Sequence, residues 1–170
     1  QHIGQTLDKG GKVLIPAFAI GRAQEIIFLL RDARRKGRIP KVPIFVDGMV
    51  RSVCGVYSQH DRYIAQPLHR EIRQFGHPFF SDGALPVRDA NERRDVLTAG
   101  PCVIVSSSGM LQGGPAAFYA AELAPDERNA ILITGYQDEE SPGRFLLNLA
   151  SEKGPRRATF SNRQVDVKCS

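Results

Sequence analysis

The chain has 170 residues, of which 42% are hydrophobic and 24% charged, which is enough apolar material for one domain with a hydrophobic core. This balance excludes an intrinsically disordered chain, and no apolar run approaches the roughly 18 residues that a membrane-spanning helix needs. The formal charge of +5 favours an acidic partner such as nucleic acid, although +5 spread over a whole surface is modest. No stretch of these residues has the pattern of a signal peptide, and we expect a cytoplasmic protein that does not bind membranes.

Cysteine and histidine usage gives no sign of a metal or disulfide framework. The three cysteines are scattered and form no Cys-x-x-Cys pair, and we expect Cys54 and Cys102, which have apolar neighbours, to be core thiols. The four histidines lie far apart and match neither of the usual zinc-hydrolase motifs: they are His2, His60, His69 and His77. We therefore predict no metal site and no catalytic residue in this chain.

Hydrophobic spacing predicts alternating strands and helices in the first half of the chain. In chain order we expect a helix end, a strand, a helix, a strand and a helix, at residues 3–9, 12–16, 22–36, 43–46 and 49–57. The chain begins at Gln1 rather than at a methionine and ends on a strand-like segment, so we expect a piece of a longer protein.

The second half continues the alternation after a less regular region at residues 60–91. We expect a helix, a strand, a helix, a strand, a helix and a terminal hairpin, at residues 91–98, 103–105, 116–123, 129–135, 143–150 and 157–167. Four strands that alternate with helices predict an α/β fold with a largely parallel sheet and helices on both faces, in three layers.

One segment, residues 101–115, looks suited to a ligand. Its strand ends in three serines and a glycine, Ser106–Gly109, and two more glycines precede the next helix. In such a segment backbone N–H groups and a helix N-terminus can face an anion. A plain strand-to-helix turn explains the same residues, and both readings stay open.

Two arginines begin predicted helices, which the helix dipole disfavours. For Arg22 the compensation is either Glu25, one turn further on, or a bound phosphate, and Arg144 poses the same question. The acidic run 138–140 is either a solvated loop before a helix cap at Ser141, or a site for a metal or an arginine.

Five stretches together resemble one family. They are residues 11–25, 43–48, 103–110, 113–115 and 133–137, the last followed by Gly143 and Arg144. Their order and spacing resemble the beta-CASP domain of the metallo-beta-lactamase-fold nucleases, which include ribonuclease J-like enzymes and cleavage and polyadenylation specificity factor-like enzymes. The Ser-Ser-Gly-Met sequence at 107–110 resembles the RNA-processing branch.

The resemblance implies a Rossmann-like domain over residues 1–170 that is inserted in a zinc-binding hydrolase domain. Single-stranded RNA would lie in the cleft between the two domains, and two zinc ions of the hydrolase domain would activate water for phosphodiester cleavage. The chain would then need its own metallo-beta-lactamase domain as partner, would carry no cofactor and would be inactive alone. A homodimer of the full-length protein is a further option.

The resemblance also assigns residues. Contacts to RNA or phosphate are implied for Arg22, Ser107, Ser108, Gly109, Met110, Tyr136, Gln137 and Arg144. A structural role is implied for Gly21, Gly113, Gly114 and Asp47, the last as a hydrogen-bond acceptor for nearby loops. Two other functions stay open, a non-catalytic α/β module for a nucleotide or phospho-ligand, and a scaffold domain of an inactive paralogue.

Overall fold

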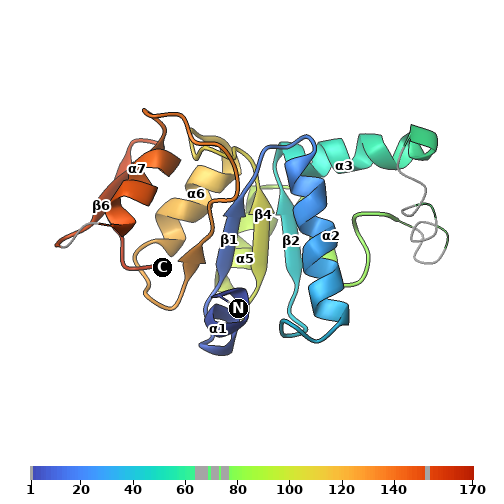
Figure 1. The fold of residues 1–170 in the computed structure, drawn as a ribbon, viewed down its shortest axis with the longest axis horizontal. Coiled ribbons are helices and arrows are strands. Elements are labelled where there is room, and N and C mark those ends of the chain that lie inside the picture. Colours follow the sequence, from blue (N-terminus) through green and yellow to red (C-terminus); the bar gives the residue numbers. More distant parts are fainter. Residues whose placement is uncertain (1, 64–68, 70–72, 74–76, 152–153) are drawn as a thin grey trace.

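A computed structural model describes residues 2–63, 69, 73, 77–151 and 154–170 (Figure 1). Its centre is a five-stranded parallel sheet in the order β3-β2-β4-β1-β5. The strands are β1 (Val13–Pro16), β2 (Ile44–Asp47), β3 (Ala84–Pro86), β4 (Val103–Ser106) and β5 (Ala130–Ile131). Val103 of the central strand pairs with both Val13 and Ile44, so the three middle strands begin level with one another.

Helices cover both faces of the sheet. In the described residues they are α1 (His2–Asp8), α2 (Arg22–Arg35), α3 (Met49–Gln59), a 3-10 turn (Asp61–Tyr63), α5 (Ala90–Thr98), α6 (Gly114–Leu123) and α7 (Pro142–Ala150). The apolar sides of α2 and α3 pack on one face of the sheet, and those of α5, α6 and α7 on the other. In Figure 1, α2 accordingly lies in front of the sheet and α5 behind it.

The central strands β1 and β4 are buried on both faces of the sheet. All four residues of β1 and of β4 are buried, and their side chains alternate between the two cores, Val13 and Ile15 to one and Leu14 to the other. Strands that are apolar on both faces are typical of a sheet covered on both sides. The predicted three-layer α/β fold is confirmed.

Two strand predictions need correction. The region 60–91 contains β3, a three-residue edge strand that pairs with β2 and ends in a proline. The predicted strand at 129–135 pairs with β1 only over Ala130–Ile131. Edge strands have a neighbour on one side only, so a few hydrogen bonds suffice to define them, and hydrophobic pattern alone does not reveal their length.

A terminal hairpin, β6 (Arg157–Phe160) and β7 (Arg163–Asp166), lies beyond α7 at the β5 end of the molecule (Figure 1). It turns its alternate residues, Ala158, Phe160 and Val165, into the core against α6 and α7. Cys54 and Cys102 are fully buried, as predicted, and Cys169 is buried as well.

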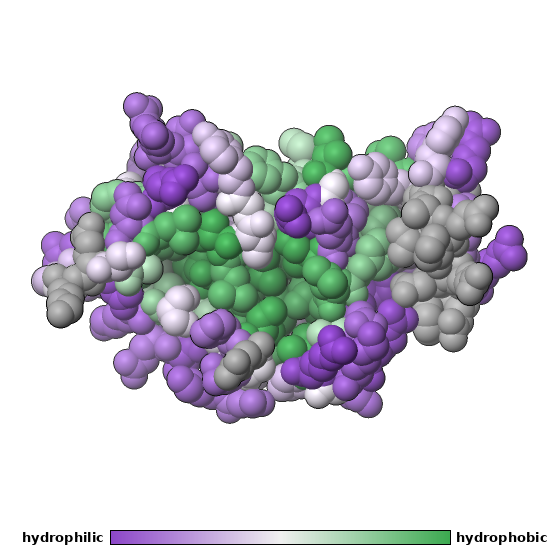
Figure 2. Space-filling view, viewed as in Figure 1, coloured by the Kyte–Doolittle hydropathy of each residue, from purple (hydrophilic) through white to green (hydrophobic). Residues whose placement is uncertain are grey.

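Hydrophobic atoms also reach the surface on the face shown in Figure 2, over β1 and β5. There a groove of about 350 Å³ is lined by apolar residues of β5, α7 and the last residues of the chain. No helix within the described ranges is both long enough and apolar enough to cross a membrane.

Candidate functional site

All five parallel strands end at one edge of the sheet, the carboxyl edge, which is uppermost in Figure 1. The segment after β4 leads to α6 on one face, whereas the segments after its two neighbours, β1 and β2, lead to α2 and α3 on the opposite face. Open parallel sheets bind ligands where connections diverge in this way. We call the loops 17–21, 107–113 and 132–141 the rim.

The middle rim loop holds its shape through its own serines. Ser107 Oγ accepts a hydrogen bond from the N–H of Met49 at 3.0 Å, which ties the loop to the start of α3. Ser108 Oγ accepts one from the N–H of Gln112 at 3.0 Å. Both serines are half-buried, and the peptide bond between them is cis. Their hydroxyls therefore already stabilise the backbone that lines the rim.

Gly109 lets the middle loop approach the first one. A Cβ atom at this position would lie 2.8 Å from the backbone nitrogen of Phe18 and 3.0 Å from the carbonyl carbon of Ala17. Gly48 is similarly constrained, since its φ is 71° and a Cβ would lie 2.8 Å from Ser107 Oγ. The three glycines to which the resemblance assigned a structural role all have positive φ angles at helix starts, and they are Gly21, Gly113 and Gly114.

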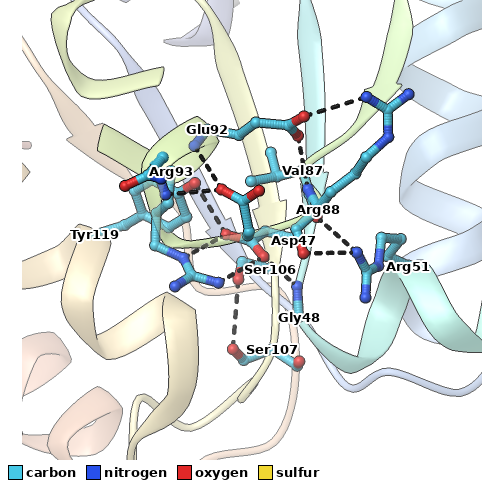
Figure 3. A network of polar contacts seen from close by, with 12 residues as sticks. Asp47, Gly48, Arg51, Val87, Arg88, Glu92, Arg93, Ser106, Ser107 and Tyr119 are labelled. Carbon is cyan, nitrogen blue, oxygen red and sulfur yellow. Dashed lines mark hydrogen bonds and ion pairs between the residues drawn. The ribbon is translucent and has the colours of Figure 1, made fainter. Parts of the chain in front are cut away.

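Asp47, at the end of β2, is the centre of a buried network (Figure 3). Its carboxylate accepts hydrogen bonds from Arg93 Nε at 2.7 Å, Arg93 Nη2 at 3.0 Å, the Tyr119 hydroxyl at 3.0 Å and the N–H of Gly48 at 2.6 Å. The hydrogen bond to Asp47 raises the pKa of Arg93, and burial together with the Asp47 charge raises the pKa of Tyr119. The network thus joins β2, α5 and α6 beneath the rim.

A second set of hydrogen bonds, together with an ion pair, lies beside this network. Arg51 of α3 donates to the carbonyl oxygen of Arg88 at 2.9 Å, and Arg88 in turn is paired with Glu92 at 3.2 Å (Figure 3). The side chain of Asp89 caps α5 by accepting from the N–H groups of Asn91 and Glu92. These contacts hold the start of α5 against α3.

Arg22 lies at the start of α2 with its side chain 51% exposed. Its guanidinium is paired with Glu25 at 2.9 Å, so the carboxylate that the sequence suggested does offset the unfavourable dipole in this structure. An exposed ion pair of this kind is worth little and exchanges readily with other ligands.

The third rim loop contains Tyr136 and Gln137, and Arg144 follows it at the start of α7. Gln137 is buried, and its Nε2 donates to the carbonyl oxygens of Gly109 and Tyr136 at 3.0 and 2.9 Å. Arg144 is half-buried and donates from Nη2 to the carbonyl oxygen of Gln137 at 3.0 Å. In this arrangement both side chains hold the loop against the middle loop, whereas Tyr136 is 69% exposed.

The acidic run of the same loop points into solvent. Asp138, Glu139 and Glu140 are all exposed, and Ser141 caps α7 by accepting from the N–H of Arg144 at 3.1 Å. The solvated-loop reading of this run is the one that the structure supports. Among the residues that the structure describes, no three histidine, cysteine or carboxylate side chains gather as a metal site would require.

Sequence reasoning missed Arg93, Tyr119 and Phe18. Tyr119 carried a signal that could have revealed it, because its hydroxyl is the only side-chain donor within the apolar stretch 116–121. Buried hydroxyls need partners, which points to an acceptor nearby. Arg93 carried no such signal, since Arg94 follows it and only the turn of α5 decides which of the two faces Asp47.

A further groove lies away from the serine loop, along α2 and α3. It measures about 720 Å³ and is mainly apolar, with Phe28, Tyr57 and Phe79 among its lining residues. It begins at Gly21 and Glu25, beside Arg22, but contains none of the middle rim loop.

Comparison with known proteins agrees with this geometry. The family model of the Beta-Casp domain matches residues 23–146. The transcription termination factor FttA of Pyrococcus abyssi is 44% identical over 144 residues, which cover 84% of this chain and 22% of that protein. FttA of Methanocaldococcus jannaschii is 42% identical over 84% of this chain and 23% of its own length. FttA of Methanosarcina mazei is 39% identical over 97% of this chain and 27% of its own length.

The chain therefore spans about a quarter of the length of the curated relatives that it matches. The matched segment contains the middle rim loop, Asp47 and both side-chain partners of Asp47, Arg93 and Tyr119. Together with the three-layer parallel fold, the match confirms the resemblance seen in the sequence: the chain belongs to the Beta-Casp domain family.

Proposed function

We propose that this chain is the substrate-clamping domain of a zinc-dependent ribonuclease, and that its rim holds single-stranded RNA. The observation that carries the proposal is that Gly109 of the uncharged serine-glycine loop packs on the first rim loop, which leads into the exposed Arg22, where the connections of the sheet diverge. The name of the relatives, transcription termination factor, is compatible with an RNA substrate. Hydrolysis would belong to a metallo-beta-lactamase domain elsewhere in the longer protein.

The zinc ions of that reaction do not fit the residues of this chain. Within the described residues there is no cluster of donor side chains that could hold a metal, and the thiols of Cys54, Cys102 and Cys169 are buried separately. We therefore derive no catalytic step from this chain, and we expect the isolated domain not to cleave RNA.

The charges of the side chains around the rim favour RNA binding on one side of it. The loop 107–113 has no charged side chain, whereas the exposed carboxylates of residues 138–140 would repel a phosphate. Arg22 begins α2, which packs on the opposite face of the sheet from α7 and the acidic run before it. The guanidinium of Arg22 can exchange its weak contact with Glu25 for a charge-assisted, bidentate contact with a phosphate. We infer that the strand passes between Arg22 and the middle loop.

Replacement of Arg22 in the full-length protein tests this function. Arg22→Ala should weaken binding of single-stranded RNA several-fold and reduce the slope of log affinity against log salt by about one contact. Arg38→Ala is the matched control, because Arg38 is also exposed but lies in the loop after α2, towards the opposite edge of the sheet. Equal affinities and equal salt slopes for wild type and Arg22→Ala would contradict the assignment of Arg22.

The length of the ligand separates the clamp from a nucleotide-binding module. A clamp should bind longer strands more tightly, because each added phosphate within its reach adds a counterion-release contribution. A module for a mononucleotide would reach full affinity with the single nucleotide. Titration of the full-length protein with RNAs of increasing length distinguishes the two.

A further inference from the structure

Phe18, in the first rim loop, lies against the backbone of both other rim loops. A Cβ atom at Gly135 would lie 3.3 Å from Cε2 of the Phe18 ring, and one at Gly109 would lie 3.2 Å from its Cδ2. The Cδ2 and Cε2 atoms of the ring thus lie against two glycines, which have no side chain to displace it. Phe18 nevertheless remains 37% exposed, so part of the ring is open to solvent.

Other large apolar side chains are exposed beside it. Tyr136, which directly follows Gly135, is 69% exposed, and Ile20 at the tip of the first loop is also 69% exposed. Met110, next to Gly109, reaches the third loop, where its sulfur accepts a hydrogen bond from the N–H of Asp138 at 3.5 Å. A single exposed apolar residue needs no explanation, but a cluster at the carboxyl edge indicates a binding surface.

A cation lies on the same turn as the ring. The N–H of Arg22 donates to the carbonyl oxygen of Ile20 at 3.1 Å, and the N–H of Ala23 donates to that of Phe18 at 3.2 Å. This tight turn keeps Phe18 and Arg22 on one short segment of the rim. A flat apolar surface next to an exposed guanidinium matches a nucleotide, which has an aromatic base and a negative phosphate.

We propose that Phe18 is a base-stacking platform, on whose open side one unpaired nucleobase of the RNA lies while Arg22 binds the neighbouring phosphate. The proposal rests on the proposed clamp function and adds to it a residue that binds the base by stacking rather than the phosphate by charge. Only a base that is not stacked within a duplex can present its face to the ring, so the platform selects single strands over duplexes. It tolerates different base sequences, because every base has a π face.

The geometry also explains why Gly109 and Gly135 are needed. A side chain at Gly109 would collide with the backbone of the first loop and displace the ring, and one at Gly135 would press on the ring itself. The competing occupant of this surface is an apolar side chain from another part of the longer protein. Such a contact would affect folding stability and would not depend on the presence of a base.

The test uses the full-length protein and a hydrolysis-resistant single-stranded RNA, with Phe18→Leu, Phe18→Trp and Phe145→Leu variants. Phe18→Leu keeps an apolar side chain but loses the aromatic ring, and it should lower affinity about tenfold with an unchanged salt slope. Phe18→Trp should keep or raise the affinity. Phe145→Leu is the matched control, because Phe145 is 51% exposed on α7, and it should bind as wild type does.

Two further ligands make the result specific. In a series of strands that each carry one fluorescent adenine analogue, the fluorescence of the analogue at one position should be quenched when wild type or Phe18→Trp binds. Phe18→Leu should not quench it. A strand that lacks the base at that position should bind wild type and Phe18→Leu equally. Thermal unfolding of each variant shows whether a change in binding merely follows a loss of folding.

The outcomes separate the two proposals. Salt-sensitive RNA binding by wild type that Phe18→Leu leaves intact overturns the platform and leaves the clamp in place. A Phe18→Leu defect that is the same with and without the base, or that accompanies a lower unfolding temperature and persists in Phe18→Trp, assigns Phe18 to an apolar contact within the protein. Absence of salt-sensitive RNA binding by wild type overturns both.

Discussion

At the scale of single residues, the rim depends on polar groups whose partners lie far away in the sequence. Asp47 and its partners Arg93 and Tyr119 are separated by 46 and 72 residues. The carboxylate is 2% exposed and fully bonded, so it acts as an anchor for the loops above it. The resemblance to the family implied an acceptor at this position, and the structure supplies the donors.

Loss of the Asp47 carboxylate should destabilise the protein strongly. In Asp47→Ala the buried Tyr119 hydroxyl and the half-buried Arg93 guanidinium lose their acceptor, and we expect the free energy of unfolding to fall by about 2–4 kcal/mol. Arg88→Ala, which breaks the exposed pair with Glu92, should cost less than about 1 kcal/mol. Urea unfolding of both variants gives the comparison, and similar losses would show that Asp47 is no anchor.

The buried Cys102 thiol predicts a loss of stability in alkali. Burial raises its pKa from 9.0 to about 11, so above pH 9 the unfolded thiol ionises first while the folded thiol keeps its proton. The unfolded state then binds fewer protons, and stability falls as the pH rises from 9 to 11. Relative to Cys102→Ala, the wild type should lose at most about 3 kcal/mol over this window. A difference between the two proteins that does not change with pH would contradict this account.

At the scale of elements, the third rim loop shows how close packing sets a loop's path. Gly143, in the first turn of α7, has the side chain of Gln137 directly against it. A Cβ atom would lie 1.8 Å from Gln137 Oε1, and the Gln137 amide is fixed by its bonds to Gly109 and Tyr136. The start of α7 and the rim therefore move together.

Gly143→Ala should destabilise the protein by about 1–3 kcal/mol, because the alanine must displace a buried, bonded amide. Gly55→Ala is the control: it lies within α3 with no atom within 4 Å of the added Cβ, and it should stabilise by about 0.5–1 kcal/mol. In a Gln137→Ala background the Gly143 penalty should largely disappear, since the obstructing amide is gone. Thermal or urea unfolding of the wild type, Gly55→Ala, the two single variants at 143 and 137 and their double variant measures these effects. Additive effects of the changes at 143 and 137 would rule out the proposed clash.

At the scale of the whole molecule, the sheet and its two helix layers place the uncharged rim loop 107–113 next to the rim loop 132–141, which carries the acidic run. The terminal hairpin completes the α6 side of this arrangement, since Phe160 is fully buried among residues of α6 and α7. This cover stabilises the helix that begins at the middle rim loop.

Phe160→Ala should cost about 3–5 kcal/mol, because it leaves a cavity where the hairpin meets α6. Phe145→Ala removes the same side chain from an exposed position on α7 and should cost much less. The two variants compared by chemical denaturation test whether the hairpin belongs to the folding unit. Equal costs would show that it does not.

Much of the fold follows from local patterns in the sequence. Helix α2 has apolar residues at helical spacing, and β1 and β4 are short apolar runs between glycine-rich or proline-containing turns, so their type and order could be predicted. The serine-glycine loop after β4 could be assigned to the carboxyl edge for the same reason, because a parallel sheet places every strand end there. The first and last residues of β3 and β5 could not be predicted, because pairing with a neighbouring strand decides them.

The fold class, the family and the identity of the rim loops could be read from the amino-acid sequence alone, because they depend on residue types at fixed local spacing. Which side chains line the rim and which support it became clear from the three-dimensional packing. Gln137 turns inward, Phe18 rests on Gly109 and Gly135, and Arg93 rather than Arg94 meets Asp47. Such outcomes depend on distances between segments far apart in the chain, which packing sets and no local pattern encodes.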